Sequence, residues 1–216
     1  MNKLDENTNF LKLVGIISML IDHIGCILLP EILLFRIIGR IAFPIFTYTT
    51  YLGYKNTKNL KKYIIRLFII GLISQPIYMI AFSRINPNIM FTLIFELFLY
   101  YSLDKKKWWY IPFIVIFSFI FNLEYSITYM FLVPMFYYFS NNSFIVILYT
   151  LTFYFNYAID KTIYSSGIPS CLTASAIFFL PFILIKFKYK FDINKFFFYL
   201  FYPIHLLTLF IIKSIM

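Results

Sequence analysis

An aspartate and a histidine, Asp22 and His23, stand side by side inside an apolar stretch near the start of the chain. Two arginines, Arg36 and Arg40, follow in the next apolar run, and a second histidine, His205, lies in the last one. An imidazole acts as a base or a nucleophile, and guanidinium groups bind anions. In segments this apolar, such residues predict group transfer or the movement of ions.

The apolar character of the whole chain predicts a membrane protein. Of its 216 residues, 62% are hydrophobic and 13% are charged, and the mean hydropathy is +0.82. Apolar runs near the ~20 residues that a helix needs to cross the hydrocarbon recur along the chain. They do not alternate with polar residues, as barrel strands would. We therefore expect an all-α, polytopic transmembrane helix bundle that forms one domain over residues 1–216, without internal repeats.

The breaks between the apolar runs predict about nine spans. These breaks are charged or rich in Pro and Asn, as at Leu29–Glu31, Lys55–Lys62 and Asp104–Lys107. The first run is long enough to span and lacks a clear small-residue cleavage site, so we expect it to be retained. The predicted spans are 9–29, 32–54, 63–83, 89–103, 109–123, 126–139, 143–158, 170–187 and 195–215.

The distribution of basic residues predicts the orientation of the bundle. If the N-terminus is cytoplasmic, that side receives most of the lysines, and the outer side receives Arg84, Lys161 and Lys213. This is the asymmetry that fixes topology, and it accounts for most of the formal net charge of +10 without a nucleic-acid partner. Cys26 and Cys171 lie in apolar surroundings and indicate neither a disulfide framework nor a metal site.

The predicted spans bring Asp22 and the two arginines to similar depths. At 1.5 Å per residue, Asp22 lies about 10 Å below the outer surface, Arg40 about 12 Å and Arg36 about 6 Å. A short Pro-Glu break joins the first two spans into an antiparallel hairpin, so Asp22 and Arg40 can meet. Because Arg36 and Arg40 are separated by one helical turn, they share a face and direct two cations to one place.

The two histidines are expected to face other parts of the bundle. Adjacent helix residues point in different directions, so we expect Asp22 to pair with an arginine while His23 faces a cavity. In the last span, Tyr199, Tyr202 and His205 step by three residues and lie along one face. Pro203, which follows Tyr202, permits a kink in this span.

Each of these residues has a purely structural alternative. The Asp22–Arg40 pair can serve only to fix packing, either histidine can be a packing residue, and Arg36 can extend to the outer interface. Glu96 is expected to be a neutral, hydrogen-bonded carboxylic acid in the bundle. Glu124 is expected at the outer rim.

Residue types alone leave several functional classes open. An intramembrane histidine beside cations fits a group-transfer enzyme. The same buried charges fit the relay of an ion-coupled transporter. A third alternative is an accessory membrane protein whose charges only lock the bundle.

Five segments carry a family pattern along nearly the whole chain, from residue 10 to 212. The segments are FLKLVGIISMLIDHIG (10–25), FRIIGRIAFPIF (35–46), YIIRLFIIGLISQPIY (63–78), NIMFTLIFEL (88–97) and FYLFYPIHLLTLFII (198–212). In this order they resemble the TraX family, which is named for the membrane acetyltransferase that N-acetylates F-pilin and looks related to wider transmembrane acyltransferases.

The resemblance implies a multi-pass protein in the inner or plasma membrane of a bacterium. Such a protein transfers an acetyl group from cytoplasmic acetyl-CoA to an acceptor at or across the bilayer. The acceptor is then a peptide N-terminal amine, as in a pilin-like protein, or a hydroxyl or amine of a glycan.

The resemblance also assigns roles to the polar residues. His23 becomes the general base or an acetyl relay, and Asp22, Arg36 and Arg40 become its supporting charges, with His205 as a second catalytic candidate. CoA carries phosphates, which the cytoplasmic lysine loops can bind. The cofactor-binding candidates are Lys62, Arg66 and Tyr202.

Overall fold

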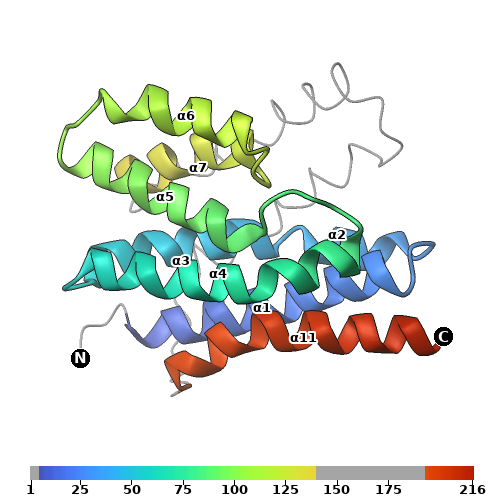
Figure 1. Cartoon of the computed structure of the whole chain (residues 1–216). Coiled ribbons are helices and arrows are strands. Elements are labelled where there is room, and N and C mark those ends of the chain that lie inside the picture. Colours follow the sequence, from blue (N-terminus) through green and yellow to red (C-terminus); the bar gives the residue numbers. More distant parts are fainter. Residues whose placement is uncertain (1–4, 140–192) are drawn as a thin grey trace.

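The structure, a computed structural model, describes residues 5–139 and 193–216, and helices joined by turns and loops make up these ranges (Figure 1). The all-α class is therefore confirmed for the described part of the chain. The spans predicted at 143–158 and 170–187 lie outside it. The helices are α1 (Asp5–Ile27), α2 (Leu33–Gly39), α3 (Ala42–Asn56), α4 (Leu60–Phe82), α5 (Ile89–Asp104), α6 (Tyr110–Ile120), α7 (Ser126–Phe139) and α11 (Lys195–Ile215).

Three of the described helices are long and apolar enough to cross a membrane. The qualifying segments are Thr8–Ile27 in α1, Leu60–Phe82 in α4 and Phe196–Ile215 in α11. The helix α6 is also apolar but has only 11 residues, so it is about 16 Å long. The count of nine spans and the orientation of the N-terminus stay predictions.

The second predicted span, 32–54, is wrong as one continuous helix. The structure ends α2 at Gly39 and begins α3 at Ala42, with a turn at Arg40 and Ile41. Pro44 supplies the reason, because it has no N–H to donate to the carbonyl of Arg40 and its ring crowds that carbonyl. The break places Arg40 at the end of α2, where its side chain leaves a turn.

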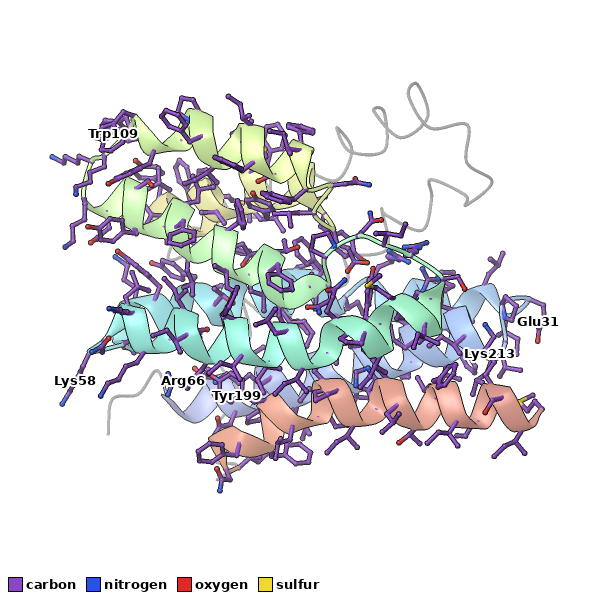
Figure 2. The ribbon with its side chains drawn as sticks, viewed as in Figure 1. Glu31, Lys58, Arg66, Trp109, Tyr199 and Lys213 are labelled. Carbon is purple, nitrogen blue, oxygen red and sulfur yellow. The ribbon has the colours of Figure 1, made fainter. Side chains whose placement is uncertain are left out.

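The helices pack in two connected groups. α1 contacts α2, α3 and α11, and α11 also contacts α4. Figure 1 shows α1, α4 and α11 running in the same direction, with α5, α6 and α7 as a second group above α3 and α4. The labelled Lys58 and Arg66 lie near one end of the long helices, and Glu31 and Lys213 lie near the other (Figure 2).

Asparagine side chains begin three of the helices. Asn59, Asn88 and Asn194 precede α4, α5 and α11, and each accepts a hydrogen bond from a backbone N–H of the first turn. Such caps satisfy donors that have no partner within the helix. Asn88 also donates to the carbonyl oxygen of Gly71 at 2.8 Å and to Oε1 of Gln75 at 2.9 Å, which fixes the start of α5 against α4.

Glycines allow α1 and α2 to approach closely. A Cβ atom added to Gly39 would lie 2.2 Å from both Cβ and Oδ1 of Asp22. One added to Gly25 would lie 2.6 Å from Cβ of Phe35. Any larger residue at either position would push the two helices apart, so these glycines determine how near Asp22 comes to the arginines.

We expect Gly39→Ala to destabilise the protein by about 1–3 kcal/mol, because the added methyl group overlaps the first atoms of the Asp22 side chain and requires backbone movement. Unfolding of the purified protein in detergent, followed by circular dichroism, measures the change. Gly71→Ala is the matched control, since its Cβ would meet only side-chain atoms of Met90 and Phe91 at 3.3 Å. Equal stabilities of the two variants would contradict this account.

A carboxyl group lies inside the core between α3 and α5. Glu96 is completely buried, and its Oε1 accepts a hydrogen bond of 2.7 Å from the hydroxyl of Thr47. Its Oε2 has no hydrogen-bond partner among the described residues. An ionised carboxylate with one donor would be very costly here, whereas the acid form is tolerated.

We therefore expect Glu96→Gln to change the free energy of unfolding by less than about 1 kcal/mol, because the amide has nearly the shape of the neutral acid and keeps an acceptor for Thr47. Chemical or thermal unfolding in detergent measures this. Destabilisation by about 3 kcal/mol or more would instead indicate that the native group is charged and paired.

Candidate active site

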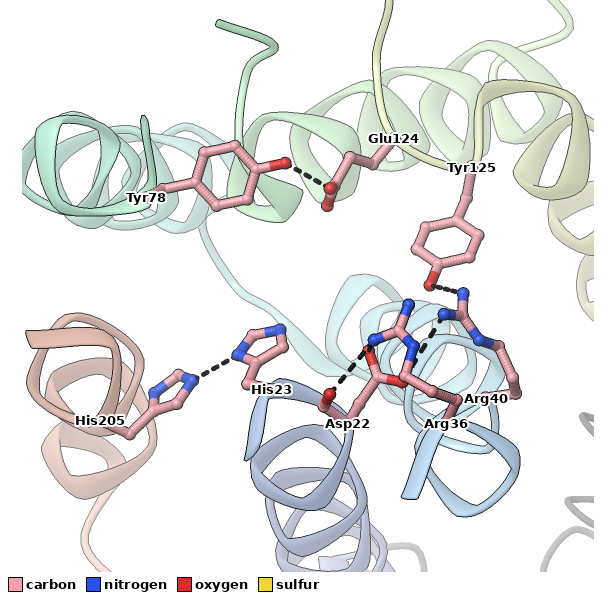
Figure 3. A network of polar contacts seen from close by, with 8 residues as sticks. All are labelled: Asp22, His23, Arg36, Arg40, Tyr78, Glu124, Tyr125 and His205. Carbon is pink, nitrogen blue, oxygen red and sulfur yellow. Dashed lines mark hydrogen bonds and ion pairs between the residues drawn. The ribbon is translucent and has the colours of Figure 1, made fainter. Parts of the chain in front are cut away.

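Eight polar side chains from six parts of the fold lie around one region, which we call the polar cluster (Figure 3). They come from α1, α2, the turn after α2, α4, the linker between α6 and α7, and α11. The members are Asp22, His23, Arg36, Arg40, Tyr78, Glu124, Tyr125 and His205.

Asp22 holds both arginines. Nη1 of Arg36 lies 2.7 Å from Oδ2 of Asp22 and donates a second bond of 3.1 Å to its backbone carbonyl. Nη2 of Arg40 lies 3.6 Å from Oδ1. The predicted meeting of Asp22 and Arg40 is confirmed, but Arg36 is the nearer partner. Arg36 thus binds inside the cluster and does not extend to the interface.

Arg40 also contacts the linker between α6 and α7. Its Nη1 donates to the hydroxyl of Tyr125 at 2.9 Å, and the ring of Tyr125 stacks on Phe43 with centroids 4.2 Å apart. Tyr125 has a φ of 56°, in the left-handed region that bulky residues rarely adopt. Such strain persists where surrounding contacts enforce it, and it is concentrated at functional sites.

Glu124 precedes Tyr125 and faces the cluster from the side opposite Asp22 (Figure 3). Its Oε1 accepts a hydrogen bond from the hydroxyl of Tyr78, and its backbone carbonyl accepts one of 3.0 Å from Thr92. Burial raises the pKa of Glu124, although the Tyr78 hydroxyl and the charges of Arg84 and Arg40 oppose the shift. Glu124 thus lies within the cluster, in the linker between α6 and α7, and its place at the outer rim stays a prediction.

The two histidines are joined directly. Nδ1 of His23 lies 2.8 Å from Nε2 of His205, and the rings are nearly parallel with centroids 5.0 Å apart. Nδ1 of His205 lies 2.7 Å from the backbone carbonyl oxygen of Phe201. His23 also contacts Phe82 edge to face, with centroids 5.0 Å apart. His23 therefore faces α11 and α4, while Asp22 faces α2, as their adjacent positions predicted.

The backbone carbonyl of Phe201 fixes the direction of the hydrogen bonds that join it to His205 and His23. A carbonyl oxygen only accepts, so Nδ1 of His205 carries a proton and donates it. If His205 is neutral, its Nε2 is an acceptor, and Nδ1 of His23 must be the donor. The remaining nitrogen of a neutral His23, Nε2, then bears a free lone pair. No described residue hydrogen-bonds this nitrogen.

Two buried polar atoms of the cluster lack hydrogen-bond partners among the described residues. They are Oδ1 of Asp22 and Nε of Arg40. Arg36 uses only Nη1 in its bonds to described groups, which leaves its Nε and Nη2 available. Because buried polar groups are normally satisfied, unused donors and acceptors in one place are typical of a site that binds a polar ligand or water.

The cofactor-binding candidates are not all in one place. Lys62 and Arg66 are exposed in the first turns of α4, and the Arg66 guanidinium lies 5.8 Å from the ring centroids of both Tyr63 and Tyr199. Tyr202 is buried, with 2% of its surface exposed, and its ring lies 5.6 Å from that of His205. It therefore borders the histidine pair and not the basic end.

The fold and the cluster define a helical membrane protein with a charged, histidine-containing centre. The TraX protein family model matches residues 7–213, nearly the whole chain, so the chain belongs to the TraX family. No solved structure matches it.

Two relatives are similar over part of their length. One is "Uncharacterized protein RP591" of Rickettsia prowazekii (strain Madrid E), 37% identical over 101 residues, which are 44% of this chain and 39% of the relative. The other is "Probable fimbrial assembly protein FimC, serogroup H1" of Dichelobacter nodosus, 32% identical over 99 residues, which are 38% of this chain and 41% of the relative. The matches thus span about two fifths of these relatives.

Proposed function

We propose that this protein is an integral-membrane acetyltransferase that moves an acetyl group from acetyl-CoA to an acceptor amine or hydroxyl. The observation that supports it most directly is the row of hydrogen bonds from His23 through His205 to the carbonyl of Phe201, which leaves Nε2 of His23 without a hydrogen-bond partner among the described residues and able to act as a base. Membership of the TraX family supports the same reaction.

In this proposal Nε2 of His23 takes the proton of the acceptor as the acceptor attacks the thioester carbon. The new bond joins the acceptor to the acetyl carbon, the bond from that carbon to sulfur breaks, and the proton passes from His23 to the CoA thiolate. The unused N–H groups of Arg36 and Arg40 hold the developing oxyanion.

Acetyl-CoA has phosphates at one end and the thioester at the other, which matches the separation of the basic candidates from the histidine pair. Lys62 and Arg66 would bind its phosphates at the basic end of α4, and the thioester would lie near His23 and Tyr202. The rise from Arg66 to Tyr78 along α4 is about 18 Å, a distance that the extended pantetheine arm has to bridge. On this proposal the N-terminus and the lysine loops are cytoplasmic, in the inner or plasma membrane of a bacterium.

The acceptor that we propose is the N-terminal amine of a pilin-like peptide, with a glycan amine or hydroxyl as the other candidate. One relative carries the name of a probable fimbrial assembly protein, which favours the peptide. The match covers only 41% of that relative, so the name of the relative does not establish the acceptor of this protein, which is part of our proposal.

The protein reconstituted in lipid nanodiscs and supplied with labelled acetyl-CoA tests this function. We expect release of the CoA thiol and labelling of a short peptide with a free N-terminus, but no labelling of the same peptide with a blocked N-terminus. An amino-sugar oligosaccharide tests the glycan. Ion flux into proteoliposomes without any consumption of acetyl-CoA would overturn the proposal in favour of a transporter.

A further inference from the structure

The turn between α5 and α6 carries a patch of basic and aromatic side chains, which we call the lysine–tryptophan turn. It consists of Lys105, Lys106, Lys107, Trp108 and Trp109. The two tryptophans are 52% and 60% exposed, which is far more than their size would favour in a packed interior. Neither takes part in the polar cluster.

The turn is a defined structure. The N–H groups of Lys106 and Lys107 donate to the carbonyl oxygens of Leu103 and Ser102, at 3.2 and 2.8 Å, which closes the end of α5. The central position of such a closure has a left-handed backbone and is usually glycine. Here it is Lys106, with a φ of 53°. A charged side chain is thus kept where glycine would be less strained.

Aromatic contacts hold the side chains of the turn in place. The rings of Trp109 and Tyr110 stack with centroids 3.7 Å apart. The ammonium group of Lys107 lies 5.6 Å from the ring centroids of both Tyr101 and Tyr110. Asp104 neutralises Lys105, at 3.2 Å, so the turn keeps an excess of positive charge.

The side chains become steadily less polar from this turn into α6. The lysines come first, the tryptophans follow, and α6 then buries only Ile114 and Ser118. Its other large side chains are exposed, among them Phe113, Ile116, Phe117 and Ile120. This order matches a bilayer from its charged surface through the headgroup level, where tryptophan is enriched, into the hydrocarbon.

We propose that the lysine–tryptophan turn binds the headgroups of anionic phospholipids and anchors α6 at the membrane surface. The lysines contact the lipid phosphates, the indole rings lie at the boundary of headgroups and acyl chains, and the exposed face of α6 contacts the chains. This inference concerns the lipid partner and does not rest on acetyl transfer.

Trp108 and Trp109 are the only two tryptophans of the chain, so intrinsic fluorescence reports on this turn without labelling. The whole protein is reconstituted in vesicles that contain lipids brominated either near the headgroup or near the end of the acyl chain. We expect stronger quenching by the shallow bromines. Stronger quenching by the deep bromines, or access only to a water-soluble quencher, would overturn the placement.

Charge preference is tested at equal mole fractions of brominated phosphatidylglycerol and brominated phosphatidylcholine. We expect about a tenfold preference for the anionic lipid at low ionic strength, which decreases in high salt. The triple change Lys105→Gln, Lys106→Gln, Lys107→Gln should abolish the preference. The control change Lys58→Gln with Lys61→Gln, at the turn between α3 and α4 and in the first turn of α4, should preserve most of it.

Equal loss in the control and in the triple variant would overturn the assignment to this turn, because the general charge of the molecule would then explain the preference. Displacement of the brominated anionic lipid by soluble CoA would overturn the assignment to lipid and indicate a phosphate site for the cofactor. Since the readout is quenching and not turnover, it is independent of whether the protein transfers acetyl groups.

Discussion

The His23→Gln variant is expected to lose acetyl transfer by a factor of about 10²–10⁴, which is the usual contribution of a positioned general base. The glutamine amide can still donate a hydrogen bond to His205, so the contact between α1 and α11 is kept. It has no basic nitrogen, however, and cannot accept the proton of the acceptor. Turnover of labelled acetyl-CoA by the purified protein in nanodiscs is the measurement.

The control for this variant is Thr208→Ala, on the exposed face of α11. It should keep the wild-type rate, and both variants should unfold at the wild-type temperature. A His23→Gln protein that is folded and fully active with a true acceptor would contradict the assignment of His23 as the base.

Changes at His205 separate a positioning role from a packing role. His205→Gln keeps one acceptor for His23 and one donor for the carbonyl of Phe201, so we expect a loss of about tenfold or less. His205→Leu fills a similar volume but leaves the Nδ1 proton of His23 without an acceptor. We expect a larger loss in the leucine variant and a changed pH dependence of the rate. Identical rates in the two variants would indicate that His205 only packs.

The pairing of Asp22 with the arginines was predictable because it depends on local sequence. The first two apolar runs are separated by a short break, so they must form a hairpin, and the rise per residue then places the charges at similar depths. The depth count favoured Arg40 as the partner. In the structure Arg36 is nearer, at 2.7 Å against 3.6 Å, because the helix ends before Arg40 and a turn redirects its side chain.

One residue in the sequence, Pro44, indicates that α2 ends before Arg40. A proline interrupts the bond to the carbonyl four residues earlier, which belongs to Arg40. Prolines within α4, α7 and α11 do not end those helices, however, so the signal was not decisive. Whether a proline kinks or breaks a helix depends on tertiary packing, which a single sequence does not contain.

The contact between His23 and His205 was beyond prediction from one sequence. The residues are 182 positions apart, and nothing local states which helix packs beside α1. The contacts of Glu124 with Tyr78 and of Tyr125 with Arg40 likewise join residues that are far apart in the chain, and local sequence does not predict them.

The Asp22→Ala variant is expected to lose about 3–5 kcal/mol of stability, the usual effect of removing one partner of a buried ion pair. The loss arises because two arginine side chains, 15% and 16% exposed, would be left without the acid that neutralises them. Unfolding in mixed detergent micelles, followed by circular dichroism, measures the difference. A change below about 1 kcal/mol would contradict the role of Asp22 as the anchor of α2 on α1.

The double variant Asp22→Ala with Arg36→Met distinguishes an uncompensated charge from lost packing. If the damage comes from the unpaired cation, removing Arg36 as well should recover part of the stability, with a coupling of about 0.5–3 kcal/mol. If it comes from lost packing alone, the two losses should add. A double variant that folds but does not transfer acetyl groups would place the Asp22–Arg36 pair in the reaction itself, because the stability of the fold would then not depend on a pair that the reaction requires.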